Sequence, residues 1–191
     1  MNAQPDRFFR REQIYRDLKG RMTASPNGEW LARIVASWCA GEGALPDHLG
    51  LAPDHFGHLL ETRFPGLTLP GVAPSGRVLD FSRMLEKEDL VRLLRSSCVA
   101  ESPEDGWLID LLVAGCLGED HLWQDLGLLA RTDLSGLIDR NFPELAARNT
   151  QDMKWKKFLY KQLCEAEGIY VCRAPSCSVC ADYAKCYGPE D

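Results

Sequence analysis

Hydrophobic side chains recur every three or four residues along most of this sequence, which is the spacing of one face of an α-helix. The pattern is clear in residues 10–22, 28–40 and 102–118, and each of these segments ends near Gly or a small polar residue that suits a helix end. We find no alternating apolar and polar run bounded by turns and no internal repeat. The sequence therefore predicts an all-α fold.

Two segments carry clear signals for where a helix starts. In residues 102–118 we expect Ser102 as the N-cap and Pro103 at the first helical position, and acidic residues follow in the first turn. This segment contains the most hydrophobic stretch of the chain, so we expect it to form the most buried helix. Residues 150–168 predict a long final helix that begins after Thr150 as its N-cap.

The length of the chain is sufficient for one domain. With 191 residues and 45% hydrophobic content, such a chain buries roughly 70% of its unfolded surface without help from a metal. We expect a single compact helical domain over residues 1–191, with a helical body over about 8–168 and a cysteine-rich tail over 169–191. Residues 64–77, rich in Pro and Gly, predict a long loop inside this body.

The charge and hydropathy of the chain exclude several classes of partner. The net charge of −6 is opposite to the basic balance that nucleic acids select, so we expect no nucleic-acid partner. We expect no membrane partner either, because no run of eighteen apolar residues occurs. The N-terminal residues are charged and lack the apolar core of a signal peptide, which predicts a cytoplasmic location.

Four cysteines close to the C-terminal end form the motif C-x4-C-x2-C-x5-C. Disulfides are rare in a reducing cytoplasm, so this cluster favours a metal site over a disulfide knot. The first three cysteines repeat the spacing of plant-type ferredoxins, whereas structural zinc sites mostly use two pairs separated by a dozen or more residues. An iron–sulfur site is favoured, with zinc, disulfides or free thiols as alternatives. The four residues are Cys172, Cys177, Cys180 and Cys186.

Further cysteines and histidines are candidate ligands outside this motif. His121 follows two acidic residues at an expected helix start, Cys116 lies one turn before it, and Cys164 lies near the end of the final helix. Each has an alternative role as a capping or core residue. His55 and His58 lie three apart on one face of an expected short helix, which could hold a metal but is also common for exposed histidines.

The expected final helix is basic just before the cysteine motif. Lys154, Lys157 and Lys161 share one stripe of it, with Lys156 beside them. The stripe could be a solvated face. Alternatively, it could attract an anionic cluster, the molybdate dianion or an acidic partner.

Three segments resemble the NifQ family of nitrogen-fixation proteins. They are GCLGEDHLWQDLGL, NFPELAARNTQDMKW and DMKWKKFLYKQLCEAEGIYVCRAPSCSVCADYAKCYGPED, so the resemblance extends from Gly115 to the end. It implies an iron–sulfur molybdoprotein that carries a molybdenum–iron–sulfur cluster and supplies molybdenum for assembly of the nitrogenase iron–molybdenum cofactor. The cysteines of the family match the four motif cysteines of this chain, which are thereby implied as the cluster ligands.

The resemblance implies a metal donor and not a turnover enzyme. The nitrogenase iron protein and the cofactor-assembly scaffold are the implied partners, with molybdate or another molybdenum source as the supply. No Gly-rich phosphate loop, H-E-x-x-H or G-x-S-x-G motif occurs in the sequence. Two alternatives remain open from the residues alone. These are an iron–sulfur protein for electron transfer or redox sensing without molybdenum, and a structural zinc module.

Overall fold

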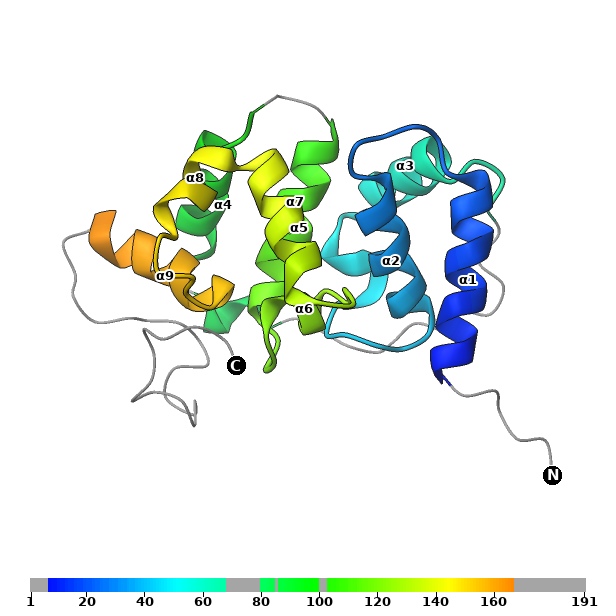
Figure 1. Cartoon of the computed structure of the whole chain (residues 1–191), viewed down its shortest axis with the longest axis horizontal. Coiled ribbons are helices and arrows are strands. Elements are labelled where there is room, and N and C mark those ends of the chain that lie inside the picture. Colours follow the sequence, from blue (N-terminus) through cyan, green and yellow to red (C-terminus); the bar gives the residue numbers. More distant parts are fainter. Residues whose placement is uncertain (1–6, 68–79, 85, 100–102, 167–191) are drawn as a thin grey trace.

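The computed structural model describes residues 7–67, 80–84, 86–99 and 103–166. Every regular element within these ranges is helical (Figure 1), which confirms the all-α prediction for them. The predicted cysteine-rich tail lies outside the described residues. The elements are α1 (Arg7–Arg21), α2 (Gly28–Cys39), η1 (Asp47–Gly50), α3 (Pro53–Arg63), η2 (Phe81–Arg83), α4 (Lys87–Ser96), α5 (Pro103–Cys116), α6 (Leu122–Asp125), α7 (Arg131–Asn141), α8 (Pro143–Arg148) and α9 (Trp155–Ala166).

Helix α5 occupies the centre of the molecule, with α1 to α3 on one side and α4, α8 and α9 on the other (Figure 1). It contacts α3, α4, α6 and η1. From Glu104 to Cys116 only Gly106 and Asp110 are more than slightly exposed. A helix that is apolar around its whole circumference is stable only when other elements cover every side. The prediction that this segment forms the most buried helix is thus confirmed, although Ser102 lies outside the described residues.

One cluster of buried apolar side chains extends from Leu18 in α1 to Leu163 in α9 and includes most of α5. Helix α1 packs along α2, and α9 contacts α4, which in turn packs on α5. The last helix of the described chain is therefore joined to the core through α4. Cys39, which lies in this cluster and is 6% exposed, is a core residue.

A buried polar network joins segments that are far apart in the sequence. Asn27, before α2, and Asn141, at the end of α7, exchange two amide hydrogen bonds of 2.9 Å. Asn27 Nδ2 also donates to Glu104 Oε2 at 3.3 Å, and Ser25 Oγ donates to Glu104 Oε1 at 2.7 Å. Arg63 of α3 forms an ion pair with the same carboxylate. Because every member has a partner, the network fixes how α2, α3, α5 and α7 sit against one another.

The last described helix begins later than the sequence predicts. The predicted N-cap Thr150 is wrong, because α9 starts at Trp155. Residues 149–154 form a turn in which Asp152 adopts a φ of 50°, a left-handed conformation that a helix does not contain.

Among the described helices, none is both long enough and apolar enough to cross a membrane.

Candidate functional site

Helix α9 is the last described element before the cysteine motif in the sequence, and buried side chains hold it to the body. Trp155, Phe158, Leu159, Tyr160 and Leu163 are each no more than 8% exposed. These positions recur at helical spacing and form the apolar stripe that holds α9 to the body. The segment that leads into the motif therefore starts from a fixed support.

The four motif cysteines, Cys172, Cys177, Cys180 and Cys186, lie outside the described residues. Their convergence on one centre remains a prediction from their spacing.

A buried ion pair locks the first turn of α9 to α6. Lys156 Nζ contacts Asp125 Oδ2 and donates to Gly118 O at 2.8 Å, and the two charged side chains are only 11% and 3% exposed. Burial raises the pKa of Asp125 above its ordinary value, although the neighbouring ammonium of Lys156 lowers it.

Glycines let the backbone approach this pair closely. A Cβ on Gly118 would overlap the Asp125 carboxylate, and a Cβ on Gly43 would lie 2.8 Å from the carbonyl oxygen of Asp125. That carbonyl accepts a hydrogen bond of 2.8 Å from Ala44 N. The loop after α2 is therefore packed against the backbone at the end of α6.

The three additional candidate ligands occupy different environments. Cys116 is 1% exposed, and burial raises the pKa of its thiol to about 12. His121 is half-buried at the N-cap of α6, where its backbone N donates to Gln124 Oε1 at 3.2 Å. Cys164 is half-buried in the last turns of α9. A role for any of them in metal binding stays a prediction.

The predicted basic stripe is less exposed than a solvated face would be, and its first member, Lys154, directly precedes α9. Lys154, Lys157 and Lys161 are all half-buried, and Nζ of Lys157 is buried without a hydrogen-bond partner among the described residues. Lys161 Nζ lies 3.6 Å from Glu165 Oε1. Lys156 points elsewhere, into its ion pair with Asp125.

The turn that precedes α9 is held by hydrogen bonds and an ion pair. Asn149 Oδ1 accepts from Met153 N at 2.8 Å, and Asn149 Nδ2 donates to Met153 O at 3.0 Å. Arg131 of α7 donates from Nη1 to Asp152 Oδ2 at 2.6 Å and from Nη2 to the carbonyl oxygens of Asp152 and Met153. Bonding to the Arg131 guanidinium lowers the pKa of Asp152. The turn is thus fixed from both sides.

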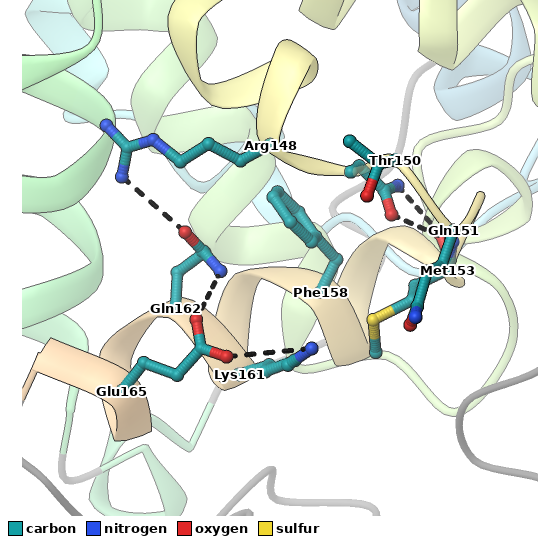
Figure 2. Close-up of a pocket in the computed structure, with 9 residues that line it drawn as sticks. Arg148, Thr150, Gln151, Met153, Phe158, Lys161, Gln162 and Glu165 are labelled. Carbon is teal, nitrogen blue, oxygen red and sulfur yellow. Dashed lines mark hydrogen bonds and ion pairs between the residues drawn. The ribbon is translucent and has the colours of Figure 1, made fainter.

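This turn and α9 line a cavity of about 420 Å³ that is open to solvent on one side, which we call the α8–α9 cavity (Figure 2). In Figure 2 hydrogen bonds and an ion pair join Arg148, Gln162, Glu165 and Lys161 in a row along one side of Phe158. The turn residues lie on the other side. The lining residues are Arg148, Asn149, Thr150, Gln151, Met153, Phe158, Lys161, Gln162 and Glu165.

The two histidines of α3 do not assemble a metal site with other described side chains. His55 and His58 are exposed, as one of the two alternatives predicted. The ring of His58 packs edge to face on Trp107 with centroids 5.6 Å apart. Across the described residues no three His, Cys, Asp or Glu side chains group closely enough to hold a metal ion.

Sequence reasoning singled out Lys161 as part of a basic stripe but missed Asp125 and the other residues of the α8–α9 cavity. Asp125 lies in the otherwise apolar segment LWQDLGL, and an acid in such a segment is a signal of a buried partner. Arg148 and Thr150 gave no comparable signal, because their proximity to Lys161 depends on the turn after α8.

The family model and the curated relatives that match this chain all carry the same name, NifQ. The family model described as NifQ matches residues 30–188 of the chain. The chain is 44% identical to Protein NifQ of Azotobacter vinelandii over 174 residues, covering 86% of the chain and 89% of that protein. It is 35% identical to Protein NifQ of Rhodobacter capsulatus, covering 84% and 87%. The protein of that name from Klebsiella pneumoniae is 32% identical, with 85% and 99% covered.

No solved structure matches the chain significantly. The matched range extends well before Gly115, so the similarity includes α2 to α5 as well as the C-terminal part of the chain.

Proposed function

The chain belongs to the NifQ family, which acts in nitrogen fixation, and we propose that it carries a molybdenum–iron–sulfur cluster as its cargo. We propose further that it donates the molybdenum for assembly of the nitrogenase iron–molybdenum cofactor. The observation that carries this proposal is the C-x4-C-x2-C-x5-C motif, which lies within the matched residues 30–188. Four soft thiolates in one short segment suit iron and sulfide. The proposed ligands are Cys172, Cys177, Cys180 and Cys186.

The seating of α9 supports a carrier role for the segment that follows it. The buried stripe and the Lys156–Asp125 ion pair hold α9 to the body at its first turns. A carrier has to present its cargo to another protein while its own fold stays intact. A helix that is fixed to the body shortly before the cysteine motif in the sequence fits this task.

The role we propose is that of a metal donor and not of a turnover enzyme. Molybdenum must leave the protein, so we propose that it is less completely ligated by protein groups than the irons are. The proposed partners are the nitrogenase iron protein and the cofactor-assembly scaffold, and the proposed supply is molybdate.

A histidine is the favoured additional ligand for molybdenum, because molybdenum accepts nitrogen and oxygen donors as well as thiolates. His121 is half-buried and lies four positions before Asp125, which forms the buried ion pair with Lys156. Cys164 is also partly accessible. Cys116 ranks last, since its burial would have to be relieved before a thiolate could form.

Metal analysis of protein isolated without oxygen tests this proposal. We expect iron, acid-labile sulfide and molybdenum in the same preparation, and a brown colour. Iron and sulfide without molybdenum would favour an electron-transfer or redox-sensing protein, which the ferredoxin-like spacing of the first three cysteines also suits. A colourless protein with one zinc ion would favour a structural zinc module.

Serine substitutions locate the ligands. Cys→Ser at any motif position should remove most of the iron, whereas Cys98→Ser should leave it in place. Cys98 is a suitable control because it is half-buried in the body and packs against the core. Equal losses from a motif variant and from Cys98→Ser would mean that the measurement reports folding and not ligation.

A further inference from the structure

Two cationic side chains from different elements meet at the α8–α9 cavity. Arg148 is the last residue of α8, and Lys161 lies in the middle of α9. Glu165 is the one carboxylate among the lining residues, so these residues together carry one net positive charge. We propose that this cavity binds a tetrahedral oxyanion. That its natural occupant is molybdate, and not sulfate or phosphate, rests on the function proposed above.

The hydrogen-bonding groups of the cavity suit such an anion. The Arg148 guanidinium has five N–H donors, and its hydrogen bond to Gln162 Oε1 is long, at 3.5 Å. Guanidinium groups pair with planar or tetrahedral oxyanions through two parallel hydrogen bonds. The hydroxyl of Thr150 and the amide of Gln151 supply further neutral donors on the opposite side of Phe158 (Figure 2).

Glu165 acts as an internal competitor that an entering anion can replace. Its Oε1 lies 3.6 Å from Lys161 Nζ, and the two side chains are 55% and 34% exposed. Exposed ion pairs of this kind are weak. A dianion in the cavity would carry more charge than this carboxylate and would contact Arg148 as well as Lys161.

The cavity is built before any ligand arrives. Asn149 and Arg131 fix the turn that forms one wall, and the buried side chains of Met153 and Phe158 form an apolar floor. The backbone of the turn is therefore fixed, whereas the donor side chains of Arg148, Thr150 and Gln151 are exposed at the rim of the cavity. Because a water molecule occupies about 30 Å³ in the liquid, the cavity of about 420 Å³ has room for an oxyanion with part of its hydration shell.

The position of the cavity in the chain fits a supply role. Its lining residue Glu165 is seven positions before Cys172, the first motif cysteine. An oxyanion held on α9 would occupy the same helix that leads into the proposed cluster segment.

Calorimetric titration of the full-length protein with sodium molybdate, sulfate and phosphate in separate runs tests the inference. We expect saturable binding of one ion. Arg148→Met and Lys161→Met should each weaken binding about tenfold, as expected for the loss of one hydrogen bond to a charged group. Lys157→Met is the matched control, since it removes the same charge from the same helix outside the cavity lining and should change affinity less than about twofold.

The variant Glu165→Gln should bind the oxyanion more tightly than the parent, whereas Arg148→Met and Lys161→Met should bind it more weakly. It removes the competing carboxylate and should tighten binding several-fold. A preference for molybdate would connect the cavity to cofactor supply, whereas equal affinities for the three ions would support a general oxyanion site. No saturable binding by the parent, or equal weakening in Lys157→Met and Lys161→Met, would overturn the inference. Lys161→Met is compared only if it keeps its helical circular dichroism signal. If that signal is lost, Glu165→Gln and Lys161→Arg replace it as tests. An unchanged oxyanion affinity in Glu165→Gln would then count against the cavity inference.

A full-length variant with serine at all four motif cysteines separates this inference from the proposed function. Oxyanion binding that survives in this variant, with its dependence on Arg148 and Lys161, supports the cavity even if the parent protein holds no molybdenum cluster. If oxyanion binding disappears while the helical signal is unchanged, the anion binds at the cysteine segment, and the cavity inference is wrong.

Discussion

The buried ion pair between Lys156 and Asp125 makes a quantitative prediction about stability. In Lys156→Met the carboxylate of Asp125, whose side chain is 3% exposed, would be left without its ammonium partner, and Gly118 O would lose a donor. Removing one member of a buried pair typically costs about 3–5 kcal/mol. Against a total stability of about 5–15 kcal/mol for a domain, this is a large loss.

Protonation of Asp125 limits the loss and gives it a characteristic pH dependence. Taking up a proton at pH 7 costs about 4 kcal/mol for a carboxyl whose pKa in the unfolded chain is about 3.9, and at pH 5 only about 1.5 kcal/mol. In the variant the folded pKa of Asp125 is raised above the unfolded value, so the folded state binds the additional proton. The stability deficit of Lys156→Met should therefore narrow as the pH falls from 7 to 5.

Urea unfolding followed by the helical circular dichroism signal, at pH 7 and at pH 5, measures this deficit. The double variant Lys156→Met with Asp125→Asn carries no buried charge, so it should recover most of the loss and show little of the pH dependence. Lys157→Met is the control on the same helix and should stay within about 1 kcal/mol of the parent. A loss below about 1 kcal/mol for Lys156→Met, or additive effects in the double variant, would refute the account of this ion pair.

Three further predictions concern the body of the protein. Burial raises the pKa of Cys39 to about 11 and of Cys116 to about 12, so both thiols should resist iodoacetamide at pH 8 until the protein is unfolded. Mass spectrometry of labelled peptides measures this resistance, and rapid labelling of the native protein would contradict the burial of the two thiols. Gly118→Ala should lower the free energy of unfolding by about 1–3 kcal/mol, because the new Cβ would overlap the buried carboxylate of Asp125. A loss under about 0.5 kcal/mol would mean that the backbone around residue 118 moves to make room for the methyl group. Arg131→Met should return the pKa of Asp152 toward 3.8 in an NMR titration. Because Arg131 lowers that pKa in the folded protein, the small stabilisation from the Arg131–Asp152 pair exists above pH 3.8 and is lost as the pH falls through the lower folded pKa. An Asp152 pKa that is the same in the variant and in the parent would show that the pair is not formed in solution.

The helix at the centre of the fold could be predicted because its signals are local. Residues 103–116 combine a proline at the start, acidic residues in the first turn and apolar residues on every side. Each of these signals is complete within the segment itself, so the helix could be predicted without knowing which elements cover it.

The start of α9 could not be predicted because it depends on distant residues. A helix starting after Thr150 agrees with capping preferences, but Arg131, about twenty residues earlier, binds the left-handed Asp152 and stabilises a turn in its place. The Lys156–Asp125 pair likewise joins residues 31 positions apart. Spacing rules describe neighbours on one helix and carry no information about such pairs.

The cysteine motif, unlike the start of α9, could be recognised from the sequence alone, because both its spacing and its family relationship are sequence properties. The match over residues 30–188 includes all four cysteines, although they lie outside the residues that the structure describes. Which metal they hold depends on chemistry that spacing alone leaves open between iron–sulfur and zinc.

The amide pair between Asn27 and Asn141 has a consequence for synthesis of the protein in the cell. The two residues are 114 positions apart, so Asn27 emerges from the ribosome long before its partner exists. At about 5–20 residues per second, the delay is about 6–23 seconds. During that interval the newly made α1, α2 and α3 would expose both their apolar faces and the amide of Asn27. Chaperones that bind apolar segments would then have their main opportunity before α7 is complete.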